Sequence, residues 1–188
     1  MKKMLAAMLT GICWIPVIDA QEITNQREYG ACKVETEVDA FTDEEKHRIG
    51  CMSVRGLLDG KDISFMGIIG GVSYSEGKST LLILINSNDI LSARQTETSG
   101  NLLVRIDQNE PETITDAEIV DGIGSGVAVV NSSESIREFL ENVKTGRDRI
   151  AIRIGTTTEA MPLSSQTTAA IEDVLNRSQN VPAFRTQD

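Results

Sequence analysis

Charged and apolar residues alternate with a period of two along several short stretches of the chain. The alternation is clear in 32–38, 100–107 and 149–154, where charged residues gather on one face and mainly apolar residues on the other. Successive side chains of a strand point to opposite faces, so this pattern predicts strands with one face in a core and one toward solvent. Half-solvated strands of this kind are typical of antiparallel sheets.

Two further stretches predict strands in a different environment. The continuous apolar run 81–85 predicts a strand that is buried on both faces. The stretch 63–74 is also rich in strand-forming residues, but Gly67, Gly70 and Gly71 interrupt it. We therefore expect a bulge or a bend in that strand.

Helical periodicity is found only in the C-terminal half. A first helix can be capped by Ser132, Ser133 or Ser135 and ends before Gly146, and a second is expected over 165–176. The expected buried residues are Ile136, Phe139, Leu140 and Val143 in the first helix, and Ala170, Ile171, Val174 and Leu175 in the second.

The order of these elements predicts a mainly β fold, an antiparallel β-sandwich with two short helices in the C-terminal half. A glycine-rich turn is expected to join 114–120 to 127–130 as a hairpin. We expect a single β-sandwich domain over 30–177, a flexible lead-in at 21–29 and a flexible tail at 178–188.

The first 20 residues have the pattern of a secretory signal peptide. Two lysines precede a short apolar run, which ends near the small residue Ala20 and falls short of the roughly 20 apolar residues that span a bilayer.

Cleavage after Ala20 leaves Cys32 and Cys51, and in an oxidising compartment we expect a disulfide between them, with free thiols as the alternative. The expected location is the periplasm or the cell exterior.

Charge narrows the class of partner. The chain has 28 acidic and 18 basic residues and a formal net charge of −10. An acidic surface repels nucleic acid and anionic lipid headgroups, so we expect neither as a partner. We also expect no integral membrane segment after cleavage, no metal and no cofactor. A protein or an envelope component remains as the expected partner.

Arg105 and Asp107 are the candidate site residues. They lie two residues apart on one face of the stretch 100–107. A buried charge is costly unless it is paired, so if both point inward we expect them to neutralise each other as a structural strut. Contact with a ligand is the alternative. Under the structural interpretation, Arg105→Ala lowers stability.

Three patterns resemble catalytic motifs but lack the context that the chemistry needs. Ser75-Glu76-Gly77-Lys78 and Lys144-Thr145-Gly146 have the S-x-x-K and K-T-G forms of penicillin-recognising enzymes, yet the first falls in an expected turn and the second ends an expected helix. His47 lies between Lys46 and Arg48, so we expect a solvated surface histidine rather than a member of a Ser-His-Asp triad. We expect no catalytic residue.

A set of short motifs spans roughly residues 35–175. In order they are Asp39-Ala40-Phe41-Thr42-Asp43, the run 81–85, Leu103-Val104-Arg105-Ile106-Asp107, Ile136-x-x-Phe139-Leu140, Ile150-Ala151-Ile152-Arg153, and Met161-Pro162-Leu163-Ser164-Ser165 with Ala170-Ile171. This order resembles small exported β-sandwich proteins of the type VI secretion-associated periplasmic accessory family and, more loosely, the invasion-associated locus B family. The chain lacks two features of that pattern, a tryptophan before the first Thr-Asp and a late cysteine. The resemblance implies an envelope protein that acts by binding.

The expected function is therefore that of a non-enzymatic exported protein that binds a protein or an envelope component, as a secretion-accessory or host-interaction factor. The alternative is an inhibitor of envelope enzymes or, with less support, a hydrolase that acts on envelope substrates. A passive structural part of a larger assembly is a third hypothesis.

Overall fold

The computed structural model describes residues 21–55, 64–73, 78–86, 101–122, 125–155 and 157–181. The expected signal peptide lies outside the described residues, as do most of the S-x-x-K motif and the end of the expected tail. The strands are β1 (Gln21–Tyr29), β2 (Cys32–Asp39), β3 (Glu45–Arg55), β4 (Ser64–Ser73), β5 (Ser79–Asn86), β6 (Leu102–Ile106), β7 (Glu112–Ile114), β8 (Ala117–Gly122), β9 (Ser125–Val130), β10 (Arg149–Ile154) and β11 (Thr157–Pro162). The helices are α1 (Ser133–Thr145) and α2 (Ser165–Ser178).

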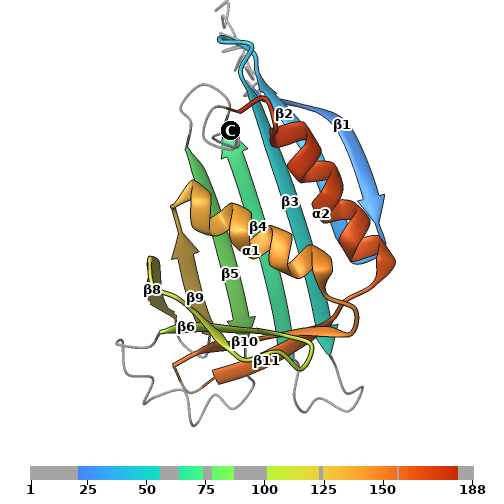
Figure 1. Ribbon diagram of the computed structural model, residues 1–188. Coiled ribbons are helices and arrows are strands. Elements are labelled where there is room, and N and C mark those ends of the chain that lie inside the picture. Colours follow the sequence, from blue (N-terminus) through green and yellow to red (C-terminus); the bar gives the residue numbers. More distant parts are fainter. Residues whose placement is uncertain are drawn as a thin grey trace, which may run out of the picture.

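The described strands form two antiparallel sheets. The larger has the order β1-β2-β3-β4-β5-β9-β8, and the smaller has the order β11-β10-β6-β7. Figure 1 shows both helices on one face of the large sheet, with β10 and β11 running across one end of the same face. The fold is thus a mainly β sandwich with two helices in the C-terminal half, as predicted, and its second layer is part sheet and part helix.

The core lies between these two layers. Leu81, Ile83 and Ile85 on the inward face of β5 are each 0% exposed, whereas Leu82 and Leu84 on the other face are only half-buried. The prediction of a strand buried on both faces is therefore confirmed for the inward face, and the other face is only half-buried. Burial of each such aliphatic side chain contributes roughly 1.5–3 kcal/mol, so the inward face carries most of the stability of this strand.

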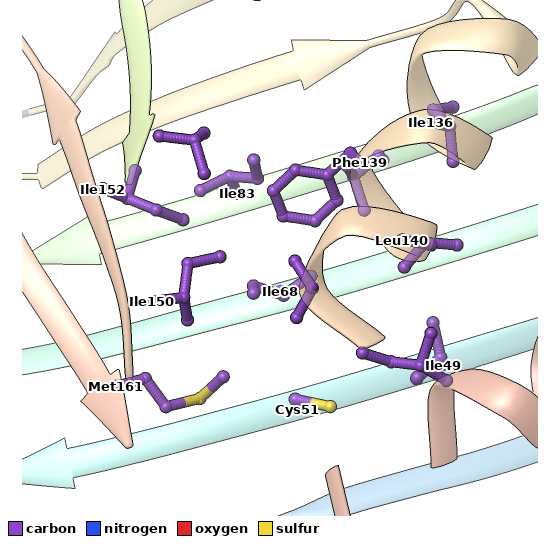
Figure 2. Packing of buried hydrophobic residues seen from close by; sticks show 14 of the residues in the cluster. Ile49, Cys51, Ile68, Ile83, Ile136, Phe139, Leu140, Ile150, Ile152 and Met161 are labelled. Atoms are coloured by element: carbon purple, nitrogen blue, oxygen red, sulfur yellow. The ribbon is translucent and has the colours of Figure 1, made fainter. Parts of the chain in front are cut away.

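Side chains of the small sheet and of α1 share this core. Figure 2 shows Ile150, Ile152 and Met161 on one side of Ile68 and Phe139 on the other. The predicted inward residues of β6 and β10 are buried without exception: Leu102, Val104, Ile106, Ile150, Ile152 and Ile154. The period-two pattern of the sequence therefore identifies the core face of both strands correctly.

Both helices begin at a capping serine. The Ser132 hydroxyl accepts the backbone N–H of Ser135 at 3.2 Å, and the Ser164 hydroxyl accepts that of Thr167 at 3.2 Å. All four predicted residues of α1 are buried, and in α2 only Leu175 of the predicted set is merely half-buried. Within the described chain, neither helix is long and apolar enough to cross a membrane.

Gly146 follows α1 because of space, not because of an unusual backbone conformation. Its φ of −67° is accessible to any residue. A Cβ atom at this position would collide with Leu163 Cδ1 and would lie 2.7 Å from Ile106 Cγ2. Glycine therefore lets the end of α1 approach β6 closely.

Residues 21–29 form β1, so the expectation of a flexible lead-in was wrong. The strand pairs with β2 from end to end, with a shift of register between Thr24 and Arg27. It lies at the edge of the large sheet, and most of its side chains are exposed, including Ile23 at 55%. An edge strand held mainly by backbone hydrogen bonds shows little apolar alternation, which explains why the sequence does not reveal it.

The predicted interruption of β4 was also wrong. The strand pairs without any shift of register with β3 and β5, through Gly67, Gly70 and Gly71. A Cβ atom on Gly70 would lie 3.2 Å from Ile49 Cγ2 and 3.4 Å from Leu81 Cδ1. Gly70 therefore makes room for large side chains on the neighbouring strands.

The segment expected as a flexible tail begins inside the fold. Ser178 ends α2, and its hydroxyl donates to the backbone oxygen of Val174 at 2.7 Å. Val181 is fully buried in the core.

The sequence did not predict β7 or β11 either, since Pro111 precedes the first and Pro162 ends the second. Proline lacks a backbone donor and is therefore confined mainly to edge strands and strand ends, and β7 and β11 are the two edges of the small sheet.

Cys32 and Cys51 form the predicted disulfide. The two residues lie directly opposite each other in the ladder between β2 and β3, with their Cα atoms 4.0 Å apart. Both are buried in the core. The bond closes a loop of 19 residues, and the loss of chain entropy in the unfolded state is worth about 3 kcal/mol.

Replacing both residues, Cys32→Ala with Cys51→Ala, should lower the free energy of unfolding by about 3 kcal/mol, because the unfolded chain regains its freedom. Urea unfolding followed by circular dichroism measures this. Reductant should cause a similar loss in the native protein and none in the double variant. An unchanged urea midpoint in the double variant would contradict the prediction.

Candidate functional site

Asp107 lies directly after β6 in a left-handed conformation, with a φ of 55°. Its carboxylate accepts the backbone N–H groups of Arg147 at 2.9 Å, Asp148 at 2.8 Å and Arg149 at 3.0 Å. Its own N–H donates to the carbonyl of Arg149 at 2.7 Å. Asp107 thus ties the end of β6 to the turn between α1 and β10.

The hydrogen bonds from the backbone lower the pKa of Asp107, that from Arg149 most, followed by those from Arg147 and Asp148. A lowered pKa in the folded state means that the ionised carboxylate stabilises the fold above the ordinary aspartate value of about 4. This stabilisation is lost as the pH falls through the folded-state pKa.

Arg105 does not pair with Asp107. Its side chain is exposed, and its Nη2 donates to the carbonyl oxygen of Gln108 at 3.3 Å. The charge of Asp107 is compensated by backbone N–H groups instead. Of the two candidate residues, Asp107 therefore has the contacts of a structural strut, and Arg105 points to solvent.

A buried polar network lies between α2 and the first strands of the large sheet. The Arg177 guanidinium donates to both carboxylate oxygens of Asp173, at 3.0 and 2.8 Å. It also donates to the Asn25 carbonyl at 2.7 Å and to the Thr36 hydroxyl at 3.0 Å. The Tyr29 hydroxyl donates to Asp173 at 3.0 Å. These bonds fix α2 to β1 and β2.

His47 belongs to this network, so the expectation of a solvated histidine was wrong. The residue is 4% exposed, and its Nδ1 lies 3.1 Å from the Thr36 hydroxyl. The Thr36 hydroxyl also accepts from the Arg177 guanidinium, so it joins His47 on β3 to α2. The burial of His47 could have been predicted from the sequence, because His47 shares its strand face with the buried Ile49 and Cys51.

Burial lowers the pKa of His47. The positive charge of Arg177 lowers it further, whereas the carboxylates of Glu45 and Asp173 oppose the shift. The histidine is therefore neutral at pH 7. The Thr36 hydroxyl is buried and engaged on both sides, which makes this contact a part of the packing of α2.

An open groove lies between β7 and α1, and we call it the β7–α1 groove. Its main cavity has a volume of about 370 Å³, and a second cavity of about 60 Å³ adjoins it. The apolar lining residues are Val104, Ile106, Ile114 and Phe139. The polar lining residues are Asn109, Glu110, Glu112, Thr113, Thr115, Asp116, Ser135, Glu138, Asn142 and Thr145.

Two elements bring the polar residues together. Glu112 lies opposite the buried Val104 in the β6–β7 ladder, so its side chain is on the inward face of the small sheet. On α1, Ser135, Glu138 and Asn142 follow one another at intervals of three and four residues and share one flank of the helix. The Asn142 amide donates to Glu112 Oε2 at 3.3 Å and joins the two walls.

The rim of the groove is acidic. Four of the described lining residues carry carboxylates, Glu110, Glu112, Asp116 and Glu138, and none of the described lining residues is a lysine, arginine or histidine. Carboxylates beside apolar walls attract cations into a cleft. The groove therefore suits a group that combines an apolar stem with a positive charge.

The β7–α1 groove was not predicted from the sequence. Its one readable signal was the spacing of Ser135, Glu138 and Asn142 beside the apolar stripe of α1. Nothing local connects them to Glu112, because the contact depends on how two distant elements pack. In the part of the chain that the structure describes, no group of three or more His, Cys, Asp or Glu side chains is arranged to hold a metal ion.

Asp107→Asn should lower the melting temperature at pH 7, because the amide has no charge and has only one oxygen to accept the three N–H groups. Asparagine tolerates the left-handed backbone, so the turn itself is kept. The difference from the native protein should begin to shrink below about pH 4, where the unfolded chain takes up a proton, and should continue to shrink as the pH falls through the lowered pKa of the folded state. Thermal circular dichroism between pH 7 and pH 2 measures this.

Arg105→Ala is the matched control and should leave the melting temperature unchanged, because this side chain is exposed. A loss of stability in Arg105→Ala with none in Asp107→Asn would reverse the assignment of the strut.

His47→Gln should flatten the dependence of stability on pH. The lowered pKa of His47 means that the unfolded chain binds a proton below about pH 6.5 that the folded chain refuses, so acid destabilises the native protein. The variant should lose about 1–3 kcal/mol at pH 7 through the broken buried contact, and the gap should narrow toward pH 5. Urea unfolding at several pH values tests this, and parallel curves would refute it.

Comparisons of this chain with models of protein families, with curated proteins and with solved structures find no match.

Proposed function

We propose that this protein is a non-enzymatic exported protein, periplasmic or secreted, which binds a segment of a partner protein in the β7–α1 groove. The observation that carries the proposal is the groove itself, an open cavity of about 370 Å³ with an apolar floor and a polar rim. Ligand-binding pockets in proteins commonly have volumes of ~300–1,000 Å³ and contain polar groups that fix the orientation of the ligand.

Export is supported by the disulfide and by the first residues of the chain. The Cys32–Cys51 bond persists in oxidising compartments and is rare in reducing ones. A charged and then apolar leader precedes it in the sequence. The resemblance to exported β-sandwich proteins supports the same location and the role of a secretion-accessory or host-interaction factor.

Binding, as opposed to catalysis, is supported by the chemistry of the lining. Of the apolar lining residues, Val104, Ile106 and Phe139 are at most 8% exposed, and the half-buried Ile114 offers a larger area for a hydrophobic contact. The hydroxyl, amide and carboxylate groups on the rim fix the orientation of a ligand. Thr36 and His47 place a hydroxyl beside an imidazole, as a nucleophile and its base would be. Both residues are buried beneath α2, where they contribute to packing.

A photoreactive amino acid at Thr113 or Glu138 should form a covalent adduct with one envelope or host protein, because both positions line the groove. The same group at Thr158, an exposed position on β11, is the control and should give no such adduct. Mass spectrometry of the adducts identifies the partner and the crosslinked peptide.

Ser135→Trp fills the groove from the α1 side and should reduce the adduct at Thr113 at least about tenfold, with an unchanged melting temperature. Equal adducts at Thr113 and Thr158, or no effect of Ser135→Trp, would show that the groove is not the binding site.

A further inference from the structure

We infer that the partner segment is extended and basic, and that it lies along β7 as an added strand with a lysine or arginine beside Glu112 and Glu138. This inference rests on the proposed function and names the chemistry of the partner. It draws on three features of the groove: a free strand edge, an acidic rim and an inward-pointing carboxylate.

The free edge is that of β7. Among the strands that the structure describes, β7 ends the small sheet and pairs with β6 alone. All of its residues, Glu112, Thr113 and Ile114, line the groove, so its unpaired edge is accessible from there. An extended peptide can add to such an edge through main-chain hydrogen bonds, while its alternate side chains enter the adjoining pocket.

The acidic rim selects the side chains of that peptide. Glu112 and Asp116 on the strand side, and Glu138 on the helix side, line the main cavity. The long stem of a lysine or arginine can lie against the half-buried Ile114 while its charged end reaches these carboxylates. A negatively charged segment would be repelled.

Glu112 imposes a requirement for a basic side chain on the added strand. Its side chain is exposed in the free protein and is on the inward face of the small sheet. A strand added beside β7 would remove water from this carboxylate, and burial of an unpaired charge is costly. A lysine or arginine in the added strand offsets that cost. The amide of Asn142 already donates to Glu112, so the incoming cation completes an existing hydrogen-bonded pair.

Fluorescence anisotropy with defined peptides tests the inference on the mature, disulfide-bonded protein. The probe is a short fluorescein-labelled peptide in which valine and lysine alternate, and its matched versions carry glutamine or glutamate at the lysine positions. We expect the lysine peptide to bind at least about tenfold more tightly than the glutamine peptide, and the glutamate peptide not to bind. Binding of the lysine peptide should weaken between 0.1 M and 1 M salt, as the screening length falls from ~10 Å to ~3 Å.

Variants of the protein localise the effect. Glu112→Gln and Glu138→Gln should each weaken binding of the lysine peptide about threefold to tenfold. Glu118→Gln on β8 makes the same change of net charge outside the groove and should have little effect. A lysine peptide that is N-methylated at alternate residues cannot donate to β7 and should bind at least about tenfold more weakly.

The outcomes separate this inference from the proposed function. Equal binding of the lysine and glutamine peptides, or equal loss in Glu112→Gln and Glu118→Gln, would overturn the basic partner. Undiminished binding of the N-methylated peptide would overturn the added strand. If no peptide binds while groove-specific photoadducts persist, the inference fails and the proposed function stands; if both are missing, both fail.

Discussion

The inward face of the seven-stranded sheet is apolar over most of its area, and no single element covers it. The small sheet covers one end, through contacts of β11 with β4 and β5, while α1 lies on β5 and α2 lies on β1, β2 and β3. The second layer is therefore built from elements of different width, since a helix is ~10 Å across and strands in a sheet are ~4.8 Å apart. The β7–α1 groove is the seam in that layer, at the point where the small sheet ends and the helix begins.

The walls of the seam are held in place at one end by specific contacts. Asp107 binds the turn that follows α1, and Gly146 lets that turn approach Ile106 on β6. The network around Arg177 holds α2, which packs beside α1, on the large sheet. The contacts of Asp107 and Gly146 therefore hold the end of α1 close to β6, the strand that pairs with β7. A groove with walls fixed in this way is preorganised, and less ordering entropy is lost when a ligand binds.

Much of the fold follows from local patterns, and the site does not. The alternation in β6 and β10 and the stripe of α1 identify the core because each reports a single face of a single element. The edge strand β1 could not be predicted in this way, because it is held by backbone pairing and its residues show no apolar alternation. Asp107 was assigned to the strand face by counting in twos, but the left-handed turn at this residue ends the alternation. The groove depends on the contact of Glu112 with Asn142, 30 residues later in the chain, and only the packing of the layers brings the two together.

The free edge of β7 can pair with unwanted strands, and it can also help to select a partner segment. Exposed edges invite indiscriminate pairing, and proteins commonly blunt them with short strands and inward-pointing charges. β7 has both protections, a length of three residues and Glu112 on its inward face. Three residues provide few main-chain hydrogen bonds, each worth roughly 0.5–1.5 kcal/mol, so backbone pairing alone cannot hold a partner tightly. The side chain that meets Glu112 then decides which segment binds, and a contact of this size favours a reversible, salt-sensitive complex over a permanent subunit interface.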